Sequence, residues 1–293
     1  MNTQKACQAA LKNPEDVEEA YAFCLRLARS HYENFPAASV LIPRRLRRHV
    51  AALYAFARIA DDFADEPEYE GVRRERLLEW RAQLADAGHK PPRHPVFSAL
   101  AETFKTLDLP KQPFDDLLSA FLQDVDKKRY ADFAEVLDYC RRSANPVGRV
   151  VLMIHGLRNE ELFRMSDDVC TALQLANFWQ DVSVDLQKDR IYIPQQDFAA
   201  CGYSEADLRM GVANERWRTL MKLEVSRARE LFDRSRALPK RLPWPLSWEI
   251  RLTWLGGRQI LRKIRDSGYD TLSNRPSLSR WEWLPLLARL PLK

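Results

Sequence analysis

Four acidic residues fall within six positions at the end of an otherwise apolar helical stretch: Asp61, Asp62, Asp65 and Glu66. At about 100° per residue, the helical period, Asp61 and Asp65 share an arc of about 60° with Tyr54 and Arg58. Apolar residues upstream lie on or beside that arc, so we expect the carboxylates to point into the protein. Two ionised carboxylates four residues apart destabilise a helix by about 0.2–0.5 kcal/mol, and by far more when desolvated without a partner. Either a cation offsets this repulsion or the cluster is a solvated acidic helix end.

A second cluster has the same spacing. Asp181 and Asp185 share an arc of about 80° with Gln174, Asn177 and Lys188 if a single helix continues through them. Large apolar residues occupy the neighbouring arc and should pack against other helices: Leu175, Phe178, Trp179 and Val182. The chain therefore contains two carboxylate pairs, each four residues apart and each beside a predicted core face.

The repeated pattern favours metal binding over two unrelated solvated helix ends. Magnesium is a hard ion that keeps several waters and takes one or two carboxylates together with phosphate oxygens. Two carboxylate pairs on separate helices are the ligands that a site for several magnesium ions and a diphosphate needs.

In combination, these motifs resemble the paired aspartate motifs of the squalene and phytoene synthases. The resemblance rests on Asp61-x-x-x-Asp65 and Asp181-x-x-x-Asp185, and extends to TyrAlaPheAlaArg at 54–58, Gln174, Asn177 and Arg190-Ile-Tyr192. It covers most of the chain, from about His31 to about Arg275. HisTyrGluAsnPhePro at 31–36 and SerAlaAsnProValGlyArg at 143–149 look most like the bacterial hydroxysqualene synthases of hopanoid biosynthesis.

The resemblance implies an all-α, isoprenoid-synthase-type helical bundle around a central cavity. It implies magnesium held by Asp61, Asp62, Asp65, Asn177, Asp181 and Asp185. It implies a substrate diphosphate bound by Arg58, Gln174, Lys188 and Arg190. Tyr54 and Tyr192 would line the path of a carbocation, which aromatic faces stabilise. Where relatives carry serines that hold a diphosphate, this chain has Tyr32, Glu33 and Asn34, and the alternative there is an ordinary helix-ending turn.

Three reactions fit that resemblance. The favoured one converts presqualene diphosphate and water to hydroxysqualene, with NADPH not expected. The others condense two farnesyl diphosphates, stopping at presqualene diphosphate or continuing to squalene with NADPH. A non-catalytic assembly or scaffold protein of the same fold is an alternative of another class, and the four retained aspartates argue against it. Other enzymes of the hopanoid pathway are expected as partners.

Asn145 is the candidate for holding the water. The Asn145-Pro146 step must interrupt a helix, since the residue before proline is disfavoured in the α-conformation. The kink would place Asn145 beside an otherwise apolar core, where a water needs at least two polar partners. A plain break between two helices is the alternative.

Composition fits a single all-α domain over residues 1–293. The chain has 9 glycines and a net charge of +5, a mild excess that suits an anionic substrate or membrane surface rather than nucleic acid. No uninterrupted apolar run of about 18 residues occurs, and no secretory leader is recognisable at the start. The five dispersed cysteines predict reduced thiols in a cytoplasmic protein.

Proline and capping signals predict the helix ends. Pro43 should open the first aspartate helix and Ser166 should cap the second. Further helices are expected at about 72–87, 96–107, 113–127, 133–143, 214–238 and 246–267. The tail at about 279–293, with Trp281 and Trp283, would either dock on the inner face of a membrane or pack over the end of the bundle.

Overall fold

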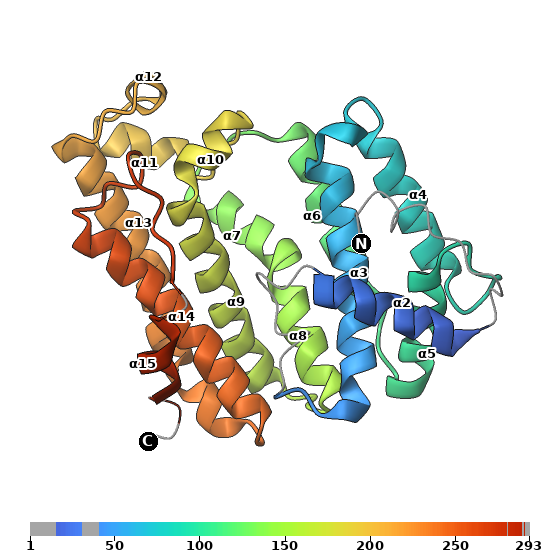
Figure 1. Ribbon diagram of the computed structural model, residues 1–293. Helices are drawn as coiled ribbons and strands as arrows, with labels where there is room; N and C mark the ends of the chain where they lie inside the picture. The colour runs from blue at the N-terminus through green and yellow to red at the C-terminus, as the bar shows by residue number, and fades with distance from the viewer. Residues whose placement is uncertain (1–15, 31–40, 280, 289, 291–293) are drawn as a thin grey trace. The chain divides into compact units, whose positions relative to one another are not determined.

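The computed structural model describes residues 16–30, 41–279, 281–288 and 290. Within these residues every regular element is a helix, and β-type pairing is confined to two isolated bridges, Ala87 with Lys90 and Arg129 with Ile191. The all-α prediction is confirmed (Figure 1). In the first half of the chain the helices are α2 (Val17–Ser30), α3 (Arg44–Asp65), η2 (Pro67–Tyr69), α4 (Arg73–Asp86), α5 (Pro95–Leu107), α6 (Gln112–Asp126), α7 (Phe133–Ser143) and α8 (Asn145–Ile154). In the second half they are α9 (Glu160–Gln180), α10 (Val182–Gln187), α11 (Gln195–Ala200), α12 (Glu205–Arg209), α13 (Glu215–Arg234), η3 (Ser235–Arg241), α14 (Leu246–Asp266) and α15 (Trp283–Ala288).

The chain divides into two compact units. The first comprises the described parts of Met1–Asp126 and Pro146–Phe163, and the second those of Lys127–Asn145 and Arg164–Lys293. The first carboxylate pair lies in the first unit and the second pair in the second. The proposal of a single domain over residues 1–293 stays a prediction.

The first unit is built around α3. Pro43 precedes the helix with φ −52°, so the predicted start is confirmed, and the backbone becomes extended at Glu66, the residue before Pro67. The buried side of α3 carries Phe56, whose ring packs edge-on against Phe97 and Phe114 and stacks on Trp80. Helices α2, α4, α5 and α6 all contact α3. A helix so enclosed holds its polar end in a fixed orientation.

The second unit packs α9, α13 and α14 closely together. Gly257 of α14 makes this approach possible, because a Cβ there would lie 2.5 Å from the Phe232 ring and 2.7 Å from Leu173. Two indole N–H groups donate to backbone carbonyls, from Trp217 to Tyr269 at 3.0 Å and from Trp254 to Phe232 at 2.9 Å. Leu173 lies one turn before Asn177, so the packing at Gly257 supports the part of α9 that precedes the second aspartate cluster.

Three predicted helix features are wrong. Ser166 does not cap α9, because Asn159 accepts hydrogen bonds from the N–H groups of Glu161 and Leu162 and the helix begins about two turns earlier. The predicted single helix through Asp185 breaks at Asp181 into α9 and α10. The helix predicted to reach residue 238 ends at Arg234 and becomes the 3₁₀ helix η3, since Pro239 lacks an N–H and obstructs an α-helical turn.

The tail packs onto α14. The ring of Trp283 lies against Gly256, Leu286 and Leu290 are buried, and Lys263 pairs with Glu282 at 2.8 Å. Among the described residues, no helix has the length and hydropathy of a membrane-spanning segment. No disulfide involves Cys24, Cys140, Cys170 or Cys201, and Cys7 lies outside the described residues.

Candidate active site

The first carboxylate pair lies on one exposed side of α3. Asp61 and Asp65 are both partly exposed, and Arg58 lies one turn earlier with a guanidinium nitrogen 3.6 Å from an Asp61 carboxylate oxygen. Tyr54 lies one further turn back and is half-buried. The structure thus brings together the four residues that the helical spacing had grouped. Their arrangement is a positive group and two acceptors at the solvent-facing end of a rigid helix.

Asp62 has a different environment from Asp61 and Asp65. Its side chain is only 1% exposed, and one oxygen lies 2.6 Å from the Arg58 guanidinium. Burial raises the pKa of Asp62 to about 7, although Arg58 lowers it. Asp62 therefore belongs with the buried face of α3, and Arg58 is the cation that accompanies it there.

The second carboxylate pair lies on either side of a helix break. Asp181 and Asp185 are both partly exposed, and the Asp185 N–H still donates to the Asp181 carbonyl at 2.8 Å. Asn177 is exposed one turn before Asp181, and its carbonyl accepts from the Asp181 N–H at 2.9 Å. Gln174 is half-buried one turn before Asn177, and Lys188 is exposed at the end of α10. The predicted residues are thus consecutive along α9 and α10 despite the break.

Arg275 was missed by the sequence reasoning. Its Nη2 donates to Asp181 at 3.1 Å and its Nε forms a second hydrogen bond to the same carboxylate. These hydrogen bonds raise the pKa of Arg275. The next residue, Pro276, offers its carbonyl to the buried Gln180 side chain at 2.6 Å. No local pattern links residues 94 positions apart, so no signal in a single sequence points to this pair.

Four charged residues join the segment after α10 to its surroundings, and we call them the Arg129 clamp: Arg129, Asp189, Glu205 and Arg209. Arg129 donates to both carboxylate oxygens of Glu205, at 2.9 and 2.7 Å, and to Asp189 at 2.8 Å. Arg209 donates to Asp189 at 2.6 Å and to Glu205 at 2.7 Å. Hydrogen bonds from Arg129 hold the pKa of Glu205 and of Asp189 at about 2. Asp189 has a φ of 56°, which is uncommon outside glycine.

The clamp determines the position of two predicted site residues. Beyond Asp189, the Ile191 N–H donates to the Lys128 carbonyl at 3.0 Å, which fixes the backbone between Arg190 and Tyr192. Arg190 is buried, and Tyr192 stacks on Phe178 with ring centroids 3.6 Å apart. Tyr130 and Tyr139 also contact the Tyr192 ring. Tyr192 is therefore part of an aromatic cluster and not an isolated exposed ring.

Asn145 is held by a neighbouring helix. The predicted interruption is confirmed, because α7 ends at Ser143 and α8 begins at Asn145. Asn145 is buried, and the Thr171 hydroxyl of α9 donates to its Oδ1 at 2.9 Å. The side-chain NH₂ is then the group left to donate to a ligand or water. The motif at 31–36, including Tyr32, Glu33 and Asn34, lies outside the described residues.

The carboxylate pairs fit magnesium in one of its usual modes. In the described part of the chain, no three His, Cys, Asp or Glu side chains converge on one point as they would in a preformed protein cage. Magnesium commonly takes one or two carboxylates and completes its shell with water and substrate phosphates. Asp61 with Asp65, and Asp181 with Asp185, each offer two partly exposed carboxylates at that spacing.

Comparison with known proteins gives a consistent result. The sequence profile of the squalene/phytoene synthase family matches residues 16–282. The phytoene synthase of Arthrospira platensis is 30% identical, over 97% of this chain and 96% of its own length. The crystal structure of the squalene synthase HpnC from Alicyclobacillus acidocaldarius is 40% identical with a TM-score of 0.82, covering 88% of this chain and 99% of that one. A dehydrosqualene synthase in complex with a ligand is 25% identical with a TM-score of 0.82, over 95% and 98% of the two chains. These likenesses confirm the predicted helical fold.

Proposed function

Because the chain belongs to the squalene/phytoene synthase family, whose profile matches nearly its whole length, we propose that it converts presqualene diphosphate and water to hydroxysqualene and diphosphate. The coarser assignment, an enzyme that processes isoprenoid diphosphates, rests on the family. The finer one is carried by Asn145, a buried amide that Thr171 holds in one orientation. The 40% identity to the squalene synthase HpnC supports it.

The two carboxylate pairs supply the magnesium ligands in this proposal: Asp61, Asp65, Asp181 and Asp185. Bound magnesium would neutralise the negative charge that develops on the departing diphosphate. Asn177 would orient the magnesium ion at Asp181 and Asp185, or a water bound to that ion. The buried Asp62 supports the Arg58 guanidinium instead of binding metal, since the two groups lie 2.6 Å apart.

Positive side chains bind the diphosphate. Arg58 and Lys188 are at least partly exposed beside the carboxylate pairs, and each supplies fixed positive charge to phosphate oxygens. Gln174 adds an amide donor, and the buried Arg190 contributes charge from within the second unit. Charges held in place before the bond breaks need no reorganisation as the leaving group develops its charge.

Water capture completes the reaction. When the carbon–oxygen bond to diphosphate breaks, its electron pair leaves with the diphosphate and a carbocation remains. The aromatic face of Tyr54 and the aromatic cluster that contains Tyr192 stabilise that cation. A water held by the Asn145 NH₂ attacks the rearranged cation, forms the new carbon–oxygen bond and loses its proton to the released diphosphate or to solvent. Nicotinamide has no role in these steps, so NADPH is not expected.

The test supplies presqualene diphosphate and magnesium to the purified chain, without nicotinamide, in ¹⁸O-labelled water. Mass spectrometry should detect hydroxysqualene carrying the solvent oxygen. Unchanged substrate, or squalene only after NADPH is added, would exclude the hydroxysqualene assignment. Asn145→Leu should abolish the labelled alcohol, Thr171→Val should reduce it, and Thr171→Ser, which keeps the hydroxyl, should restore it.

Phytoene synthesis is the second candidate, because phytoene synthases are about 30% identical over nearly the full chain. Parallel incubations with geranylgeranyl diphosphate and with farnesyl diphosphate distinguish these candidate functions. Phytoene from the first would favour this candidate. Presqualene diphosphate from the second would place the enzyme one step earlier. A scaffold role would require that no diphosphate be consumed in either.

A further inference from the structure

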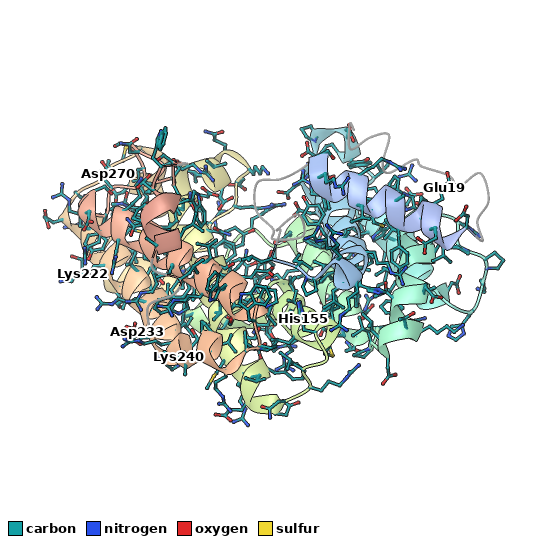
Figure 2. The ribbon with its side chains drawn as sticks, turned by 60° about the horizontal axis from the view of Figure 1, so that its bottom comes forward. Glu19, His155, Lys222, Asp233, Lys240 and Asp270 are labelled. Carbon is teal, nitrogen blue, oxygen red and sulfur yellow. The ribbon has the colours of Figure 1, made fainter. Side chains whose placement is uncertain are left out.

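Two tryptophans are exposed where η3 meets α14. Trp244 is 71% exposed and Trp248 is 37% exposed, only four residues apart. Lys240 and Arg241, in the last turn of η3, are exposed beside them in sequence. Figure 2 shows Lys240 at the margin of the orange helices of the second unit. We call these residues, together with Arg251, the tryptophan corner.

The corner is rigidly built. Leu242 and Leu246 on either side of Trp244 are buried, so the chain is anchored before and after the exposed ring. The Ser247 N–H donates to the Pro243 carbonyl at 3.0 Å, and the Trp248 N–H donates to the Pro245 carbonyl at 3.1 Å. Because the backbone is fixed, the exposed rings do not result from a loose terminus.

Two other tryptophans of the second unit are directed inward. Trp254 of α14 donates its indole N–H to the Phe232 carbonyl at 2.9 Å, and the ring of Trp283 in α15 lies against Gly256. The second unit therefore has inward-facing sites for indole rings. Trp244 and Trp248 lie outside them and keep much of their surface in water.

In the sequence segment that carries the exposed rings, the charge at the surface has one sign. Residues 235–252 contain four basic side chains, Arg236, Lys240, Arg241 and Arg251, and one acidic side chain, Glu249. Glu249 is buried, so its carboxyl group lies away from the surface, and burial raises its pKa to about 7, so it is only partly ionised near neutral pH. Asp233, which precedes this segment, is paired with Arg258.

We propose that the tryptophan corner docks on an anionic lipid bilayer. Indole rings are favoured at the boundary between headgroups and acyl chains, where the ring is apolar and its N–H remains hydrated. Lysine and arginine side chains beside them are attracted to anionic headgroups. This contact goes beyond the proposed function, and it places membrane binding at residues 240–251 rather than in the tail at 279–293.

The test measures co-sedimentation of the full chain with vesicles of phosphatidylcholine alone or mixed with phosphatidylglycerol. The unaltered chain should bind the mixed vesicles more strongly. Lys240→Gln with Arg241→Gln should weaken that binding roughly 30-fold, the value expected for two charges at an anionic surface. Trp244→Ser with Trp248→Ser should weaken binding to mixed vesicles about tenfold through lost apolar contact.

Two matched controls replace exposed apolar residues elsewhere, Met210 at the end of α12 and Trp281 in the tail, which are 69% and 68% exposed. Met210→Ser and Trp281→Ser should bind vesicles as the unaltered chain does. Binding that survives both double variants, or that is lost in Trp281→Ser alone, overturns the proposal. A dimer that Trp244→Ser with Trp248→Ser dissociates, without any vesicle binding, would assign the surface to a second copy and also overturn it. None of these readouts uses enzymatic activity, so the proposed function is tested separately.

Discussion

The two carboxylate pairs have the same spacing in sequence but different surroundings in the structure. Asp61 and Asp65 stand on the unbroken helix α3, and the nearest arginine, Arg58, comes from the same helix. Asp181 begins a new helix after a break and pairs with Arg275, which is 94 residues away in sequence. The segment following Asp185 depends on the Arg129 clamp, whose members come from three separate parts of the second unit.

This difference shows two ways of positioning the same chemistry. In the first unit, a regular helix presents the carboxylates and four neighbouring helices pack against it. In the second, long-range ion pairs define a conformation that local propensity does not favour, including a non-glycine residue with positive φ. We therefore expect the second pair to be the more sensitive to substitutions remote from the substrate.

Replacing one carboxylate in each pair gives the largest expected effect. Asp61→Asn and Asp181→Asn each remove one proposed magnesium ligand with little change in volume. Turnover should fall at least about a thousandfold in both, since each pair contributes several kcal/mol to stabilising the leaving group. Steady-state kinetics over a magnesium titration provide the measurement, with circular dichroism as the check on folding. Near-normal turnover by either folded variant, or undiminished turnover in chelator, would show that the two pairs are not functionally equivalent.

Breaking the clamp should have the next largest effect and should act on the second pair alone. Arg129→Gln removes the donor to both Glu205 and Asp189, which frees the segment that carries Lys188, Arg190 and Tyr192. Turnover should fall about 10–100-fold, because small displacements of binding groups cost that much. Hydrogen exchange should rise at residues 188–193 and remain unchanged in α3.

Arg76→Gln is the matched control for the clamp, because Arg76 pairs with Glu79 at 3.0 Å on an exposed helix face of the first unit. It should leave turnover within about twofold of normal, as exposed pairs contribute little. If Arg129→Gln reduces stability without increasing exchange at residues 188–193, the clamp only stabilises the fold. The positioning role would then be wrong.

The two arginines nearest the pairs should differ in their effect on stability. Arg58→Gln leaves the buried Asp62 without its cation, so the free energy of unfolding should fall by about 3 kcal/mol. Arg275→Gln removes a partner from the partly exposed Asp181, and the loss should be below about 1 kcal/mol. Urea denaturation of both variants at neutral pH gives the comparison. Equal losses would mean that Asp62 is solvated in solution and that the two arginines have the same role.

The predictable part of the molecule is the part governed by local signals. The helix predicted at 133–143 and the predicted start at Leu246 match the structure. The helical period correctly placed Asp61 and Asp65 on one side of α3. The same period puts Asp62 about 100° from Asp61, which already separates it from that pair.

The remaining features depend on contacts that periodicity does not encode. The break at Asp181 coincides with contacts from Arg275 and Pro276, and the clamp joins Arg129 to residues 60 and 76 positions away. Ser166 resembled a cap because two acids follow it, yet Asn159 with two following glutamates provides the actual helix start. Competing local signals and long-range ion pairs therefore account for the errors near the site.

The smallest expected effect is on the pH dependence of stability. It distinguishes two buried carboxyl groups, Asp62, which lies beside the cation Arg58, and Glu249, for which burial alone shifts the pKa. Burial raises the pKa of both Asp62 and Glu249 to about 7, but only Asp62 has an arginine among the causes that shift it. An unfolded glutamate titrates at about 4.3, so the folded chain holds the Glu249 proton to higher pH than the unfolded chain does. The contribution of Glu249 to stability is therefore fully present below about pH 4, and it is lost as pH rises through about 7.

Glu249→Gln keeps the shape of the protonated acid and does not titrate. Relative to the unaltered chain, it should change the free energy of unfolding little at pH 5 and raise it by about 1–2 kcal/mol at pH 8, as measured by urea denaturation. A difference that is the same at both pH values would show that Glu249 is ionised in the folded protein, with a cation or water satisfying its charge as Arg58 does for Asp62.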